Sequence, residues 1–346
     1  MFRQAAKPFL FAVSLLVAVG TIEVGFRITN KGRPPEWSFY HPRGYLTDDP
    51  VLGFAPTPGF SSPWKKFMLS NNSAGFRDAE HAVEKGPGVM RVLAVGDSQT
   101  WGANVDVGST YLRQLAVKKN IEVLLGGVPG YASDQAVARF RREAPRWKPD
   151  VALLAVFLDH QYGDLPRLAA HKHFGLYRVA GGHLVPNSVA MKIQGGGLRG
   201  AWAALVLYVR ANSHLSFFIR SFGADPTLQG QFFVPLTRIS PAEKNETIGM
   251  LIDNLRDFQT AAAEAKAKPI VIFIPSLAHY LAPDPSAKAT TEEVLRRTRR
   301  LGLLVLDLHP RFYRNLSEQK PLYFPDNHLS PVGHEVVAEE LEKFFQ

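Results

Sequence analysis

A serine with the setting of a nucleophile stands after the first apolar run of this chain. The residues at 92–95 are apolar and lead into Gly96, Asp97 and Ser98. A small residue allows a sharp turn from strand to helix, and the free backbone N–H groups of a helix N-terminus favour developing negative charge. Ser98 is therefore a candidate nucleophile. The same residues would also serve as an ordinary helix N-cap.

The candidate base is His328, in the segment 324–334 that follows the last predicted strand. A histidine that accepts a serine proton needs a carboxylate to orient its ring. Asp326 lies two residues earlier and could do this from an irregular turn. Asp307, at the end of a predicted strand, is a second acidic candidate, although a strand-end cap is the simpler interpretation of it.

Five short apolar runs without polar alternation must position these residues. Such runs are typical of strands buried on both faces, and here helical stretches separate them. Strands that alternate with helices predict an α/β fold, a three-layer α/β/α domain of flavodoxin-like type with five parallel strands. Ligands of such sheets bind beyond the carboxyl ends of the strands. The runs are residues 92–95, 122–125, 151–157, 270–274 and 303–306.

Helix signals separate these strands. Ser240 to Glu243 form a capping box with proline in the first helical position. A second helix is predicted to start at Ser133 and to end before Pro145, because proline breaks a helix interior. Pro331 is expected to open the last helix.

The N-terminus carries an export pattern, a positive flank followed by an apolar run. Arg3 and Lys7 precede an uncharged stretch at 8–22, which Glu23 ends. Residues 1–30 are predicted to be a membrane helix that serves as a signal anchor, or a signal peptide cleaved near residues 18–20; a buried core helix is the plainer alternative. Positive-inside charge predicts that the remaining chain faces the periplasm or the exterior, and that it is secreted if the signal is cleaved.

Three further segments complete the predicted organisation. Residues 31–88 are rich in proline, glycine and aromatics and are expected to be an irregular leader that packs onto the domain. Residues 89–346 form the α/β domain. The span 165–238 interrupts the alternation and is interpreted as an inserted cap beside the site, because long connections tend to be functional. A second membrane span at 201–209 is disfavoured by Arg210.

In these motifs the chain resembles the SGNH, or GDSL-type, hydrolase superfamily. Its first motif is similar to Gly96-Asp97-Ser98, its second motif glycine corresponds to Gly130, and its last motif matches Asp326 and His328. The resemblance covers residues 89–345. It implies a Ser-His-Asp triad and an oxyanion hole that includes the N–H groups of Ser98 and Gly130.

More specifically, the chain resembles the membrane-anchored bacterial members. These carry a short N-terminal helix that ends in Glu and Arg, as at Glu23 and Arg27. They also carry an Asn-x-x-Gly-Phe-Arg segment ahead of the serine strand, here from Asn72 to Arg77.

The third motif of the superfamily departs from its usual form. Where the family has Asn, whose amide completes the oxyanion hole, the spacing places His160, with Gln161 next to it. A neutral imidazole or an amide can donate a hydrogen bond to an oxyanion, with different geometry. Leu125 also replaces an Asn that is common in the second motif.

The resemblance implies an extracytoplasmic serine esterase that removes acyl groups from small esters or carbohydrates. A polysaccharide O-acetyltransferase with the same triad, working with a multi-span acyltransferase partner, is one alternative. A non-catalytic glycan-binding or assembly protein is another, because of the altered third motif.

Composition removes other classes of function. The chain has no cysteine, which excludes thiol nucleophiles and thiolate metal sites. His171 and His173 lack a recognisable third metal ligand, so neither a metal nor another cofactor is expected. The net charge is +9, but the dense arginine cluster at 296–300 has no interleaved aromatics, so no nucleic-acid partner is expected.

Overall fold

The computed structural model describes residues 2–29, 41–42, 44–158, 177–180, 183–186, 241–277, 285–317 and 321–345. The chain divides into two compact units, and the described part of the first is helix α1, Phe2–Ile28. Leu15, Val17 and Val24 are among the exposed apolar side chains of α1. Among the described residues, no helix is long and apolar enough to cross a membrane, so the predicted membrane helix is not found.

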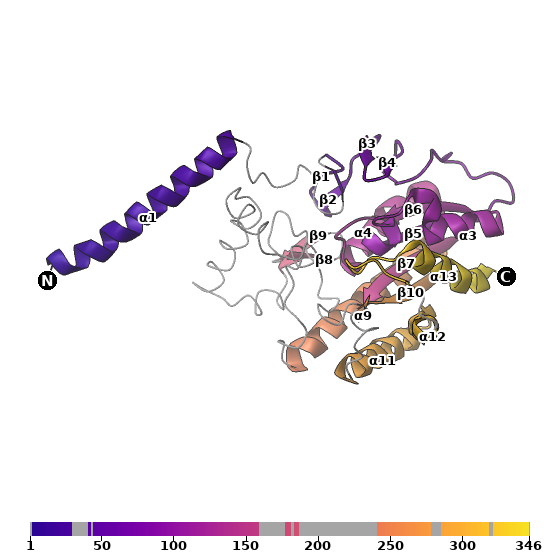
Figure 1. Cartoon of the computed structure of the whole chain (residues 1–346). Helices are drawn as coiled ribbons and strands as arrows, with labels where there is room; N and C mark the ends of the chain where they lie inside the picture. The colour runs from indigo at the N-terminus through magenta and orange to yellow at the C-terminus, as the bar shows by residue number, and fades with distance from the viewer. Residues whose placement is uncertain are drawn as a thin grey trace. The chain divides into compact units, whose positions relative to one another are not determined.

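The second unit is built on a parallel sheet of five strands, which confirms the predicted α/β class (Figure 1). The strand order β11-β10-β7-β5-β6 places the first strand in chain order between the second and the third, as in flavodoxin-like sheets. Each strand overlaps one predicted apolar run. The strands are β5 (Arg91–Gly96), β6 (Glu122–Gly127), β7 (Val151–Leu158), β10 (Lys268–Pro275) and β11 (Leu304–Asp307).

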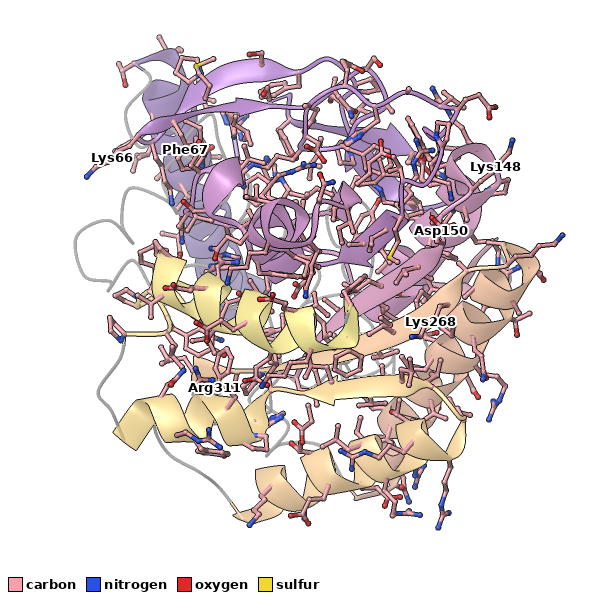
Figure 2. All side chains as sticks on the ribbon, turned by 90° about the vertical axis from the view of Figure 1, so that its right-hand side faces the viewer. Lys66, Phe67, Lys148, Asp150, Lys268 and Arg311 are labelled. Atoms are coloured by element: carbon pink, nitrogen blue, oxygen red, sulfur yellow. The ribbon has the colours of Figure 1, made fainter. Side chains whose placement is uncertain are left out.

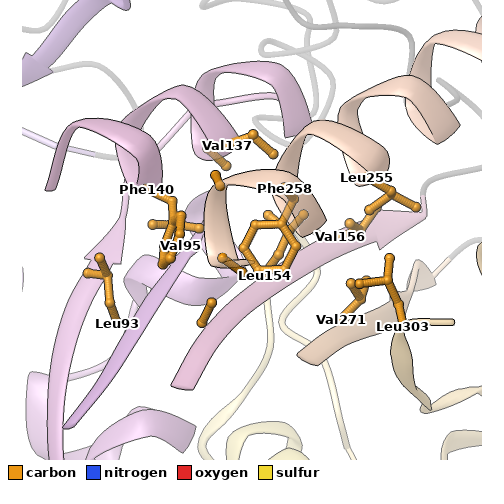
Figure 3. Packing of buried hydrophobic residues seen from close by; sticks show 14 of the residues in the cluster. Leu93, Val95, Val137, Phe140, Leu154, Val156, Leu255, Phe258, Val271 and Leu303 are labelled. Atoms are coloured by element: carbon orange, nitrogen blue, oxygen red, sulfur yellow. The ribbon is translucent and has the colours of Figure 1, made fainter. Parts of the chain in front are cut away.

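Helices α4 (Ser133–Trp147), α9 (Pro241–Glu264) and α11 (Pro285–Arg300) cover one face of the sheet. Their apolar side chains pack on those of the strands in one buried cluster, shown in Figure 3. At its centre Phe140 and Phe258 meet edge to face, with ring centroids 5.4 Å apart. Aromatic burial of this kind fixes α4 and α9 against the sheet.

Helices α3 (Tyr111–Lys119), α12 (His309–Ser317) and α13 (Pro331–Glu342) cover the other face. Arg311 of α12, labelled in Figure 2, lies between these two helices. Its guanidinium donates to Glu339 of α13 at 3.0 Å. The unit therefore has the α/β/α layering that the sequence predicts. Three short helices, α2 (Ser98–Trp101), η1 (Val107–Ser109) and η4 (Lys343–Phe345), complete the described helical segments.

The leader is more regular than predicted, because it contains two antiparallel hairpins. They consist of β1 (Leu46–Asp49) with β2 (Gly53–Pro56) and β3 (Ser61–Trp64) with β4 (Phe67–Ser70). Asp49 closes the first turn by accepting the N–H groups of Val51 and Leu52. Lys65 makes the second turn with a φ of 52°. Strands of four residues are too short to show a periodicity.

The predicted end of α4 is corrected by the structure, whereas most of the predicted cap lies outside the described residues. Helix α4 continues through Pro145 to Trp147, because the burial of Ala144 and Trp147 in the core outweighs the backbone hydrogen bond that proline cannot donate. The predicted cap at 165–238 lies outside the described residues, except for the antiparallel strands β8 (Tyr177–Ala180) and β9 (His183–Pro186).

A partly buried charged cluster joins the leader to the start of the sheet, and it consists of Asp78, His81, Arg91, Arg113 and Glu122. His81 contacts Asp78 through Nε2 at 3.0 Å and Glu122 through Nδ1 at 2.9 Å. Arg91 donates to Glu122 at 2.6 Å, and Arg113 pairs with Asp78. Burial alone would lower the pKa of His81, but the hydrogen bonds and charges of Asp78 and Glu122 outweigh burial and raise that pKa.

This cluster predicts a pH-dependent stability. A raised histidine pKa stabilises the fold fully below the unfolded value of about 6.5, and this contribution is lost as pH rises through the folded value. We expect the free energy of unfolding of the wild type to fall between pH 6 and pH 9 by more than that of His81→Gln. Urea unfolding at several pH values measures both slopes. Equal slopes would show that the cluster does not hold a protonated imidazole.

Candidate active site

The candidate nucleophile stands at a tight turn between β5 and α2. Asp97 is the N-cap of α2, and its carboxylate accepts the Gln99 N–H at 2.9 Å. Ser98 is the first residue of the helix. Gly96 cannot be replaced without rearrangement, because a Cβ there would lie 2.3 Å from Thr100 Oγ1. The structure therefore has the sharp turn from strand to helix that the sequence predicts at Gly96, Asp97 and Ser98.

The far end of α2 is held by an arginine of the leader. Arg77 is buried and donates to the carbonyl oxygens of Trp101 at 2.9 Å, Gly102 at 2.7 Å and Val105 at 2.7 Å. Its guanidinium also lies 4.6 Å from the centroid of the Trp101 ring. The last carbonyl groups of a helix have no hydrogen-bond donors within the helix. The Arg77 side chain supplies such donors at the end of the helix that carries Ser98.

Loss of this arginine should be strongly destabilising. We expect Arg77→Met to lower the free energy of unfolding by about 3–5 kcal/mol, because the buried carbonyls of Trp101, Gly102 and Val105 lose a charged donor. Urea denaturation measures the change, and the more exposed Arg296→Met on α11 is the matched control. A loss below about 1 kcal/mol, the value of a surface ion pair, would contradict this role.

The structure brings Ser98, His328 and Asp326 together. His328 Nε2 lies 2.9 Å from Ser98 Oγ, across 230 residues of sequence. On the other side of the ring, His328 Nδ1 lies 3.3 Å from Asp326 Oδ2. Ser98 and His328 are buried, while the Asp326 side chain is 33% exposed. With Nδ1–H facing the carboxylate, Nε2 is the nitrogen that can accept the serine proton.

The carboxylate of this group is held in its ionised form. Burial would raise the pKa of Asp326, but hydrogen bonding and the charge of His328, with a further hydrogen bond from Asn104, outweigh burial and lower it to about 2. Asn104 Nδ2 donates to Asp326 Oδ2 at 2.6 Å. Asp326 is thus an anion throughout the range in which a histidine base operates.

Two residues that sequence reasoning missed hold the loop of His328. Gln99 Nε2 donates to the Asn327 carbonyl at 2.8 Å, and Gln99 Oε1 accepts the Leu329 N–H at 2.9 Å. Asn327 Oδ1 accepts the Leu277 N–H at 2.6 Å. Asn327 has a φ of 69°, a conformation that asparagine tolerates better than most residues. The available signal was the position of Gln99, next to the nucleophile.

The turn after β6, residues 127–130, packs on the turn after β5 that carries Ser98. The Val128 N–H donates to the Gly96 carbonyl at 3.0 Å, and a Cβ on Gly127 would lie 2.4 Å from Trp101 N. Gly130 is exposed and has a φ of 83°, which favours glycine. The N–H groups of Ser98 and Gly130 stay the predicted oxyanion donors. His160 and Gln161 lie outside the described residues.

The alternative acid has another partner. Asp307 Oδ1 contacts His309 Nδ1 at 2.7 Å and accepts the His309 N–H at 3.1 Å, so Asp307 caps α12 at the end of β11. No group of three or more His, Asp or Glu side chains in the described part of the chain could hold a metal ion. His171 and His173 lie outside that part.

Comparisons with known proteins give structural likeness at low identity. No protein-family model and no curated protein matches the chain. A member of the lipolytic protein G-D-S-L family from Veillonella parvula DSM 2008 is 10% identical over 74% of this chain and 98% of that one, with a TM-score of 0.42. A catalytic mutant of Axe2, an acetylxylan esterase from Geobacillus stearothermophilus, is 14% identical over 75% and 95%, with a TM-score of 0.42.

LAE5, an alpha/beta hydrolase enzyme from the metagenome of Lake Arreo, Spain, is 15% identical over 74% of this chain and 94% of that chain, with a TM-score of 0.41. Membership of the family stays a resemblance, and we infer function from the geometry of the site.

Proposed function

We propose that this protein is a serine esterase whose nucleophile is Ser98. The observation that carries the proposal is the 2.9 Å contact between Ser98 Oγ and His328 Nε2. That distance is within the range for proton transfer between a nucleophile and its base. Asp326, on the opposite side of the imidazole ring, supplies the carboxylate that orients it.

In the first half-reaction Ser98 Oγ attacks the ester carbonyl carbon while His328 Nε2 takes the hydroxyl proton. The carbonyl oxygen becomes an oxyanion, which the N–H groups of Ser98 and Gly130 stabilise. The tetrahedral intermediate then collapses, the bond from carbon to the alcohol oxygen breaks, and the imidazolium gives its proton to the leaving alcohol. An acyl-serine remains on the enzyme.

In the second half-reaction water replaces the alcohol. His328 Nε2 takes a proton from water as the water oxygen attacks the acyl carbon, and a second oxyanion forms in the same position. Collapse breaks the bond to Ser98 Oγ, which regains its proton from the imidazolium. The products are a carboxylic acid and the free enzyme, with no cofactor in either step.

The substrate class that we propose is a small O-acyl ester, with acetylated carbohydrate as the first example to test. The motif resemblance supports this choice. If a sugar hydroxyl replaced water in the second half-reaction, the same triad would give an O-acetyltransferase. Products formed from an acetyl donor in the presence of a glycan distinguish the two reactions.

A serine-reactive fluorophosphonate probe tests the proposal directly. We expect the wild type and the matched control Ser109→Ala to be labelled, and Ser98→Ala to remain unlabelled. The wild type should also release acetate from an acetylated oligosaccharide. If the folded wild type resists the probe and releases no acetate, but binds glycan, the protein is a binding module and not an esterase.

We also propose that the enzyme works outside the cytoplasm and that α1 directs its export. The support is the positive flank of Arg3 and Lys7 and the exposed apolar side chains of α1. A C-terminal alkaline phosphatase fusion, expressed in a Gram-negative host, should be active. The same fusion lacking residues 1–30 should be inactive. Equal activity of the two fusions would refute export through this segment.

A further inference from the structure

The turn of the second leader hairpin reaches the acid of the proposed triad through one asparagine. Lys65 lies at the turn between β3 and β4, and its ammonium group donates to Asn104 Oδ1. Asn104 Nδ2 donates in turn to Asp326 Oδ2 at 2.6 Å. A continuous chain of hydrogen bonds therefore runs from Lys65 to the carboxylate beside His328.

The chemistry of this chain fixes one orientation of the amide. An ammonium group only donates and a carboxylate only accepts, so the Asn104 oxygen must face Lys65 and its nitrogen must face Asp326. The opposite orientation would place two donors together at Lys65 and two acceptors together at Asp326. Asn104 also has a φ of 67°, which asparagine adopts more readily than most residues.

The same carboxylate oxygen serves both the asparagine and the base. Asp326 Oδ2 accepts from Asn104 and lies 3.3 Å from His328 Nδ1. The His328 backbone N–H faces the other oxygen, Oδ1, at 3.4 Å. Among the described hydrogen bonds of this carboxylate, the one from Asn104 is the shortest, so it contributes most to holding the carboxylate plane. The positive charge of Lys65, relayed by the polarised amide, strengthens that donor. Burial lowers the pKa of Lys65, and the charge of Asp326 opposes this effect.

We propose that Lys65 and Asn104 are positioning residues for the reaction, which hold the Asp326 carboxylate in the plane that His328 requires. The second leader hairpin thereby completes the acid end of the site. This inference rests on the proposed esterase function. It assigns a role to a lysine that lies outside every catalytic motif of the sequence.

Steady-state kinetics of three variants tests the proposal. We expect Lys65→Met to lower kcat for p-nitrophenyl acetate about fivefold. This factor corresponds to the upper end of the interaction free energies of exposed ion pairs. Asn104→Gly, which keeps the positive φ, should lower kcat about tenfold, because Asp326 loses a charged hydrogen bond. KM should stay near the wild-type value in both. Lys66→Met is the matched control, since Lys66 is exposed at the same turn (Figure 2).

Conservative replacement separates positioning from hairpin stability. Lys65→Arg keeps the charge and the donors, so it should retain most of the wild-type rate. Lys65→Met and Lys65→Arg should both unfold at the wild-type temperature, which would show that the difference in rate does not come from hairpin stability. In the Asp326→Asn background, Lys65→Met should cause no further loss, because the group that Lys65 positions is gone. An equal loss in both backgrounds, or a loss shared by Lys66→Met, would overturn the proposal.

The fluorophosphonate probe separates this inference from the proposed function. A wild type that labels at Ser98, with Lys65→Met and Asn104→Gly labelling at the same rate, would refute the positioning role alone. A wild type that does not label would refute the esterase. Slower labelling of both variants at unchanged thermal stability is the result that we expect.

Discussion

If Ser98 is the nucleophile, Ser98→Ala should abolish ester turnover, with a fall in kcat of about 10⁶-fold, the size of loss when a serine protease loses its nucleophile. Without Oγ no acyl-serine can form, and His328 Nε2 has no hydroxyl to deprotonate. The fold should remain, because the N-cap hydrogen bond of α2 comes from Asp97 and not from the serine side chain. Turnover of p-nitrophenyl acetate measures the loss, and thermal unfolding checks the fold.

Two further variants sharpen this test. His328→Ala should fall nearly as far as Ser98→Ala, and the double variant should fall no further, since residues that act as one unit show strongly non-additive effects. Ser109→Ala, outside the site, should keep the wild-type rate. If Ser98→Ala retained more than about 1% of turnover, a different group would be the nucleophile and the proposed mechanism would be wrong.

The sheet was predictable because β5, β6, β7 and β10 are almost entirely buried, and the partly exposed edge strand β11 still has an apolar run. Continuous apolar runs at β5, β6, β7, β10 and β11 carry the signal by themselves. The leader hairpins have no such signal. Strand β3, for example, consists of Ser61 to Trp64 with a proline inside, and is held by one partner strand and by packing of Trp64.

Sequence separation limits what could be foreseen of the site. Ser98 could be proposed because it directly follows a strand, and Asp326 and His328 because their residue types and spacing complete a known chemical set. The structure adds that helix α12 lies between β11 and the loop of Asp326 and His328. Gln99 and Asn104 could not be assigned roles, because their partners in the loop of His328 lie 222 or more residues away and nothing periodic links them. Hydrogen bonds between loops depend on how the strand ends are placed, which local patterns do not encode.

Asp326→Asn should reduce kcat about 10⁴-fold while leaving Ser98 and His328 in place. Asp326 Oδ2 accepts from Asn104 and faces His328 Nδ1, whereas Oδ1 faces the His328 backbone N–H at 3.4 Å. Both oxygens therefore meet donors. With the amide oxygen at the Oδ2 position, the side chain keeps these acceptor contacts but loses the negative charge that stabilises the imidazolium. With NH₂ at that position, it selects the imidazole tautomer that carries its proton on Nε2. That nitrogen then cannot accept the proton of Ser98.

Asp307→Asn is the matched control for this prediction. Asp307 is the alternative acid considered in the sequence analysis, and its carboxylate also contacts a histidine, His309. Asp307 pairs with His309, so its loss should cost stability and leave kcat within about twofold of the wild type. Activity lost in Asp307→Asn and kept in Asp326→Asn would reverse the assignment of the acid. Equal rates in all three proteins would mean that His328 needs no carboxylate, and that Ser98 and His328 act as a dyad.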